Sequence, residues 1–221
     1  MSVGTTGAST GEAPTTSERR RSRLVWWVGA GIAVILVAAA GFAWLRRAGA
    51  APQYGIVIDS AQPAADFTLD SSLGRPVALS EFRGQPVLLY FGYTTCPDVC
   101  PTTLADLRLA LQELGEDRDK VQVLFVSVDP ERDTVERLAA YLPYFDPSFI
   151  GLTGPLAEIE AIASRFGVFF QKNTANSAAQ YLVDHTSAVL LLDADGALRL
   201  MFPYGTTGKQ LASDIRIFIR S

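Results

Sequence analysis

Two cysteines between an apolar run and a helical pattern constrain this chain more than any other feature. Residues 87–91 are continuously apolar, which is typical of a strand covered on both faces. Gly92 and a short polar turn follow, then Cys96 and Cys100, with Pro101 suited to the first helical position. Strand-to-helix junctions are where α/β folds place their chemistry. The dipole and free N–H groups of a helix N-terminus favour thiolate, the form that attacks disulfides and binds soft metals.

The cysteine pair is compatible with a structural disulfide, a redox dithiol or half of a metal site. The protein contains no other cysteine. A disulfide closing so short a loop would constrain little of the unfolded chain, so we favour a functional pair. The spacing, Cys96-Pro-Asp-Val-Cys100, is one residue wider than the C-x-x-C of thioredoxins. The wider loop leaves room for an ion between the two sulfurs.

The remainder of the chain alternates predicted strands and helices. Besides 87–91, strands are expected at 65–69, 77–79, 121–128, 149–152, 168–170, 188–192 and 198–202. Helices are expected from Pro101 to Gly115, from a capping box at Asp133 and Glu136 to about Leu142, at 155–166 and at 207–220. This order predicts an α/β, thioredoxin-like fold with a central mixed sheet flanked by helices.

An uncharged stretch of 22 residues, Leu24–Leu45, predicts a single transmembrane helix before that domain. As a helix it would be about 33 Å long, enough for a bilayer core of about 30 Å. Trp26, Trp27 and Trp44 lie near its ends, and four arginines precede it while two follow, which places the N-terminus in the cytoplasm. A cleaved signal peptide is the alternative, because residues 48–50 resemble a cleavage site, but the run exceeds a usual signal sequence.

The anchor divides the chain into four predicted parts. They are a disordered cytoplasmic tail (1–23), the anchor (24–45), a linker (46–63) and an exported domain (64–221). The arginines are confined to the membrane boundary, unlike those of a mitochondrial presequence. We therefore expect the bacterial inner membrane, with the domain on the periplasmic side. Residues 1–47 hold six of the 19 basic and two of the 23 acidic residues, so the remainder has net charge −8 and is a poor nucleic-acid binder.

His185, the only histidine, is the candidate third residue of the site. It precedes a buried strand, at the end of the domain that faces the cysteine turn in thioredoxin-like folds. Two thiolates and one imidazole suit copper, since soft sulfur favours Cu(I) and imidazole accepts either oxidation state. Structural zinc usually takes four ligands, so a zinc site would also need Asp98 or Asp184.

Three motifs together resemble the Sco/SenC family. They are YFGYTTCPDVCP at 90–101, VSVDPERD at 126–133 and VDHT at 183–186. The similarity covers roughly Ala61 to Ile219. It implies a membrane-tethered copper protein with a thioredoxin fold. Members of the family deliver copper to the dinuclear copper site in subunit II of cytochrome c oxidase, or keep its cysteines reduced.

Carried over to this chain, the resemblance makes Cys96, Cys100 and His185 the ligands of Cu(I) and Cu(II), the same three residues reached above. We expect a copper metallochaperone whose partners are oxidase subunit II and an exported thiol reductant, because an oxidising compartment tends to close such a pair into a disulfide. The alternative is an enzyme, an exported thiol–disulfide oxidoreductase. Thr186-Ser187 stand where thioredoxin-like reductases have a proline, which favours the metallochaperone.

Overall fold

The structure, a computed structural model, describes residues 31–32, 34–39, 41, 51–58, 62–173 and 181–219. The chain divides into two compact units, 1–50 and 51–221, and the described residues of the first unit are helical. No helix among the described residues has both the length and the apolar character needed to cross a membrane. The predicted tail and most of the predicted anchor lie outside the described residues.

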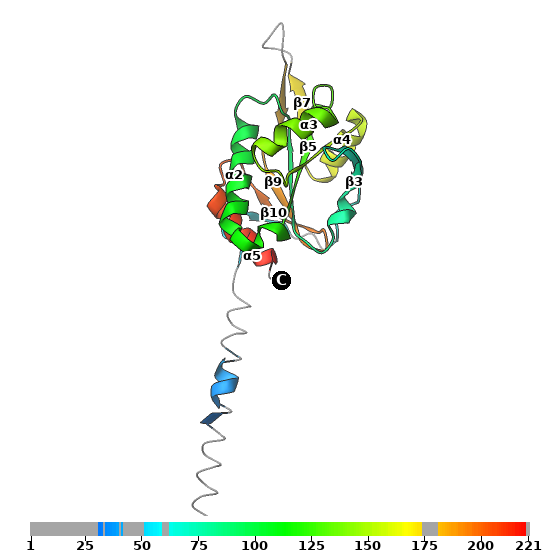
Figure 1. The fold of residues 1–221 in the computed structure, drawn as a ribbon. Helices are drawn as coiled ribbons and strands as arrows, with labels where there is room; N and C mark the ends of the chain where they lie inside the picture. Colours follow the sequence, from blue (N-terminus) through cyan, green and yellow to red (C-terminus); the bar gives the residue numbers. More distant parts are fainter. Residues whose placement is uncertain are drawn as a thin grey trace, which may run out of the picture. The chain divides into compact units, whose positions relative to one another are not determined.

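An eight-stranded mixed sheet forms the centre of residues 51–221 (Figure 1). Its order is β1-β10-β9-β4-β5-β6-β2-β3. The strands are β1 (Ile56–Val57), β2 (Thr68–Ser71), β3 (Pro76–Ala78), β4 (Val87–Gly92), β5 (Gln122–Ser127), β6 (Ile150–Thr153), β9 (Val189–Leu192) and β10 (Leu198–Phe202). β4 pairs in parallel with β5 and antiparallel with β9. All its residues are buried, which confirms the strand predicted from the apolar run.

Helices cover both faces of this sheet. α2 (Val99–Leu114) and α5 (Gly208–Ile219) pack together on one side, and α3 (Val135–Tyr141) and α4 (Leu156–Arg165) lie on the other (Figure 1). Leu104, Leu107 and Leu111 of α2 are buried, as their helical spacing predicted. Three short 3-10 helices complete the elements: η1 (Leu79–Phe82), η2 (Gly115–Lys120) and η3 (Leu142–Tyr144). The predicted thioredoxin-like arrangement of a mixed sheet between helices is confirmed.

A separate two-stranded sheet carries the histidine. β7 (Phe170–Asn173) pairs antiparallel with β8 (Leu182–His185), with Phe170 opposite His185. The apolar pattern predicted a strand at 168–170 and no strand between that one and 188–192. The hairpin escaped detection because its strands are largely solvent-exposed and lack the apolar alternation that identifies a half-buried strand.

The N-terminus of α3 differs from the prediction by one residue. Thr134, not Asp133, is the N-cap, and its side-chain oxygen accepts a hydrogen bond from the Arg137 backbone N–H. Either residue type suits an N-cap, so the sequence pattern could not choose between them. Asp133 is fully buried and has other partners.

Part of the predicted linker packs against the domain. Strand β1 pairs with the edge strand β10. Just before it, the backbone N–H groups of Gln53, Tyr54 and Gly55 donate to the carboxylate of Asp214 at 2.8–2.9 Å. Asp214 lies on α5 and is 1% exposed. One carboxylate therefore ties the start of this unit to its last helix.

We predict that Asp214→Ala lowers the free energy of unfolding by about 2–4 kcal/mol, because three backbone donors lose a charged acceptor. It should also expose residues 51–58 to limited proteolysis. Urea unfolding and a protease time course measure the two effects. Asp119→Ala is the control, since that side chain is 90% exposed. Equal stability of the Asp214 and Asp119 variants would contradict the proposed tie.

Candidate metal centre

Both cysteines lie at the carboxyl end of β4. Helix α2 begins at Val99, two residues before the predicted start, so Cys100 is in its first turn. The Cys100 backbone N–H points at the Cys96 sulfur, 3.4 Å away, which is the helix N-terminus effect expected from the sequence. Cys100 is fully buried, whereas Cys96 is partly exposed, and both are free thiols.

The two thiols differ in acidity. A hydrogen bond from the Cys100 thiol and the backbone N–H groups of Asp98 and Cys100 lower the pKa of Cys96 to about 5. The same bond to Cys96, together with burial, raises the pKa of Cys100 far above its ordinary value. At neutral pH the pair therefore holds one negative charge, on the sulfur that solvent reaches.

His185, the last residue of β8, lies against this pair. Its Nε2 is 3.5 Å from the Cys100 sulfur, and its Nδ1 is 3.2 Å from the Val183 carbonyl oxygen. A carbonyl oxygen only accepts hydrogen bonds, so Nδ1 carries a hydrogen, and Nε2 is the ring nitrogen that faces the sulfur. Metal-binding histidines are commonly oriented in this way, through the ring nitrogen that does not bind the metal.

Cys96 and His185 line one open groove of about 220 Å³, and the buried Cys100 contacts both of them from behind. The groove is lined by Tyr93, Cys96, Pro97, Asp98, Val99, Leu182, Val183, Asp184, His185 and Ser187. Asp98 and Asp184 thus lie beside the site, and Asp184 also accepts a hydrogen bond from Asn173. In the part of the chain that the structure describes, no three histidine, cysteine or acidic side chains are already grouped tightly enough to hold an ion.

Tyr93 is a site residue that the sequence analysis did not single out. Its ring meets the His185 ring edge-on, with centroids 5.7 Å apart. Its hydroxyl accepts a hydrogen bond from the Val183 backbone N–H at 3.3 Å, so it contacts both His185 and the strand that carries it. The position of Tyr93 just before the cysteine turn could have indicated a role in the site, but a tyrosine at the end of a buried strand is equally typical of the hydrophobic core.

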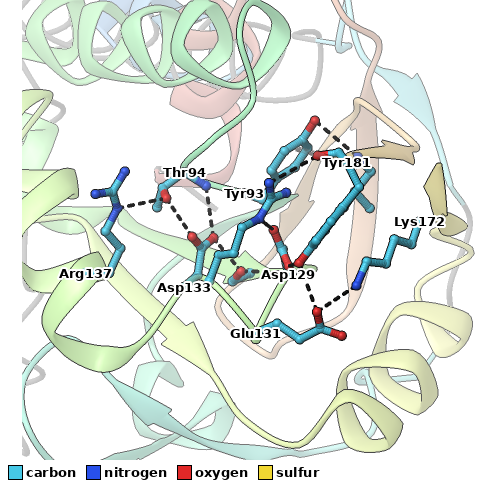
Figure 2. Close-up of polar contacts among 11 residues, drawn as sticks. Tyr93, Thr94, Asp129, Glu131, Asp133, Arg137, Lys172 and Tyr181 are labelled. Carbon is cyan, nitrogen blue, oxygen red and sulfur yellow. Dashed lines mark hydrogen bonds and ion pairs between the residues drawn. The ribbon is translucent and has the colours of Figure 1, made fainter. Parts of the chain in front are cut away.

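A buried carboxylate holds the turn that leads to Cys96. Asp133 accepts hydrogen bonds from the Thr94 backbone N–H at 2.9 Å, the Thr94 hydroxyl at 2.6 Å and the Ser127 hydroxyl at 2.7 Å (Figure 2). Arg137 also donates to the Thr94 hydroxyl oxygen. A fully buried carboxylate with three donors is well satisfied. Asp133 therefore fixes the cysteine turn to the end of β5.

We predict that iodoacetamide modifies Cys96 before Cys100 in the metal-free protein, because only Cys96 is exposed and ionised. Since its pKa is lowered to about 5, the Cys96 rate should be nearly constant between about pH 6 and 8, where an ordinary thiol reacts faster as pH rises. Fragment mass spectrometry assigns the modified cysteine. Preferential labelling of Cys100, or a rate that climbs to pH 9, would contradict this asymmetry.

We predict that Asp133→Ala destabilises the protein by about 2–4 kcal/mol, because it leaves the Thr94 N–H and two hydroxyl groups buried without an acceptor. The variant should also lose the pH-independent reactivity of Cys96, since the turn is no longer fixed. Chemical unfolding and alkylation rates measure both effects. Glu136→Gln, at an exposed position on the first turn of α3, is the control and should change neither. A stable Asp133→Ala protein with unchanged Cys96 kinetics would contradict the anchoring role.

Known proteins match most of the second unit. The SCO1/SenC family model matches residues 58–220. The chain is 37% identical over 153 residues to the mitochondrial SCO2 homolog of Bos taurus, covering 68% of this chain and 58% of the relative. It therefore spans less than two thirds of that protein's length. It is 34% identical over 162 residues to the SCO2-like protein of Rickettsia felis, covering 73% and 79% of the two chains.

The structure of Bradyrhizobium japonicum ScoI with copper bound superposes with a TM-score of 0.65 at 38% identity. The match covers 71% of this chain and 99% of that chain. Cys96, Cys100 and His185 all lie inside the stretch that the family model matches. The fold, the motifs and these similarities agree, and the chain belongs to the SCO1/SenC family.

Proposed function

We propose that this protein binds one copper ion through Cys96, Cys100 and His185 and transfers it to the cysteines of the dinuclear copper site in cytochrome c oxidase subunit II. One observation carries the proposal: the imidazole of His185 lies 3.5 Å from the Cys100 sulfur, although 85 residues separate the two, and Cys96 and His185 open onto one groove. This donor set suits copper in both oxidation states. The copper-bound relative described above supports the choice of metal.

The asymmetry of the cysteines suggests how the ion would arrive and leave. Cys96 is ionised and reached by solvent, so it would make first contact with incoming Cu(I). Binding would then displace the proton of buried Cys100, because thiolate is the metal-binding form. During transfer, a thiolate of the partner would replace the protein's ligands one at a time. His185 lies on the small hairpin and is the ligand most easily exchanged.

The same geometry supports a second candidate, thiol–disulfide exchange. The Cys96 thiolate would attack a disulfide of the partner, forming a mixed disulfide and releasing one partner thiolate. Cys100 would then lose its proton and attack the Cys96 sulfur, releasing the second partner thiolate and leaving Cys96 and Cys100 joined. The partner gains two electrons and this protein loses them, so an exported reductant would have to restore the dithiol. Reduction of a target would also prepare it for copper.

We further propose that Leu24–Leu45 anchors the protein in the bacterial inner membrane with residues 48–221 on the periplasmic side. The uncharged run and the excess of arginine before it support this orientation. Protease added to intact spheroplasts should digest the exported part. Its protection from protease would overturn the orientation, and a mature N-terminus near Ala51 would show a cleaved signal instead.

We predict that Cys96→Ala and Cys100→Ala each abolish tight Cu(I) binding, because a single thiolate cannot hold the ion. His185→Ala should weaken Cu(II) binding much more than Cu(I) binding, since two thiolates suffice for Cu(I). Separate competition titrations of the two ions, with circular dichroism to confirm folding, measure this. Asp184→Asn is the control beside the histidine and should retain one copper. Wild-type Cu(II) affinity in His185→Ala would remove the histidine from the site.

The two candidate functions are separated by adding oxidised or previously reduced subunit II domain to the reduced protein, with and without Cu(I). Transfer of copper to the reduced target alone supports the metallochaperone. Reduction of the target by metal-free protein, with closure of a Cys96–Cys100 disulfide, supports the oxidoreductase.

A further inference from the structure

The hairpin that carries His185 is not part of the main sheet. In the described part of the chain, β7 and β8 pair only with each other. No ladder of backbone hydrogen bonds therefore sets the distance between His185 and the cysteines. Besides the short chain link from His185 to β9, side-chain contacts set this distance. They concentrate where Tyr181 and Lys172 meet the loop between β5 and α3, residues 129–133 (Figure 2).

The inner contacts join Asp129 and Arg132 of this loop to Tyr181, and we call the three the Tyr181 clasp. The Tyr181 hydroxyl donates to the Asp129 carboxylate at 2.7 Å, and Arg132 donates to the Tyr181 carbonyl oxygen at 3.1 Å. The Arg132 guanidinium carbon is 3.8 Å from the centre of the Tyr181 ring and is also ion-paired with Asp129. Asp129 is only 4% exposed, and its bond to Tyr181 is partly buried.

Two further charged groups enclose the ring. Lys172 of β7 places its ammonium 3.7 Å from the centre of the Tyr181 ring and pairs with Glu131 at 2.7 Å. Glu131 also accepts from the Tyr181 hydroxyl. Two cations at these distances cannot share one face of a ring, so the tyrosine lies between arginine and lysine. Cation–π contacts of this kind attract both cations to the ring and so favour this placement of the tyrosine.

The Tyr181 clasp is connected by direct contacts to the histidine and to the cysteine turn. Arg132 also lies over Tyr93, 5.7 Å from its ring centre, and Tyr93 contacts His185. The next residue of the same loop, Asp133, holds Thr94 and hence the cysteine turn. One short loop therefore contacts both parts of the site: Asp129 and Arg132 bind Tyr181, which precedes β8, and Asp133 binds the cysteine turn.

We propose that Arg132 and Tyr181 are positioning residues that hold His185 ready for Cu(II) at the dithiol. The proposal rests on the proposed function, in which His185 is a copper ligand. Releasing the clasp lets the hairpin move, so metal binding must first restore its position and affinity falls accordingly. Only binding that uses the imidazole incurs this cost. The clasp should therefore matter for Cu(II) and hardly at all for Cu(I), which two thiolates can hold.

The test uses the full-length protein and titrates Cu(II) and Cu(I) separately against chelators of known affinity. We expect Tyr181→Ala and Arg132→Ala to lower Cu(II) affinity about tenfold, the lower range for groups that orient a metal ligand, with Cu(I) affinity changed less than about twofold. The Cu(II) electron paramagnetic resonance spectrum should lose part of its nitrogen coupling. Tyr144→Ala is the matched control, because that tyrosine is 83% exposed on η3 and should change nothing.

Conservative variants keep the test decisive if an alanine variant does not fold. Tyr181→Phe retains the stacked ring but loses the bond to Asp129, and Arg132→Lys retains the charge but loses the planar, forked donor. Each should lower Cu(II) affinity less than the alanine variant does, and still leave Cu(I) binding unchanged. Unfolding measured on the same samples separates positioning from stability.

His185→Ala, measured in the same experiment, separates a failure of the proposed function from a failure of the positioning role. Unchanged Cu(II) binding in His185→Ala would overturn the proposed function itself. If His185→Ala loses Cu(II) affinity but the Tyr181 and Arg132 variants do not, the proposed function stands and the positioning role is overturned. A parallel loss of Cu(I) and Cu(II) affinity that follows the loss of stability would also overturn it, because the clasp would then only stabilise the fold.

Discussion

The burial of β4 is the constraint on which the rest of this structure depends. The strand is flanked by β5 and β9 in the sheet and covered by helices on both faces, so it has no freedom to shift. The cysteine turn begins where β4 ends, and α2 starts within the same few residues. A rigid strand followed at once by a helix N-terminus supplies both a fixed position for the sulfurs and backbone N–H groups that stabilise thiolate.

His185 is held near the cysteines by interactions of a different kind. His185 comes from a hairpin outside the main sheet, so its position depends on side chains: the Tyr93 ring and hydroxyl, and Tyr181 against the loop at 129–133. Such contacts are weaker and more easily reorganised than a sheet ladder. This combination would suit the proposed transfer of copper, with two ligands on the most rigid element and one on a less firmly attached element.

Hydrophobic pattern was informative where elements are buried and uninformative where they are not. The apolar run of β4 and the leucine spacing of α2 predicted those elements because burial imposes a period on the sequence. The exposed β7–β8 hairpin carries no such period and was missed. Asp133 was assigned to a helix cap because Asp and Thr are both good caps. Its contact with Thr94 joins residues 39 positions apart, which a local motif cannot reveal.

The sequence by itself determined the chemistry of the site. With two cysteines and one histidine in the chain, the possible thiolate and imidazole ligands were known before any fold was considered, and the four-residue cysteine spacing beside a helix start brings both sulfurs together locally. Only the tertiary structure decided which cysteine is exposed and ionised, which ring nitrogen of His185 faces the sulfur, and which side chains hold the histidine near the dithiol. Those properties depend on burial and on contacts between distant segments, and both exist only once the chain has folded.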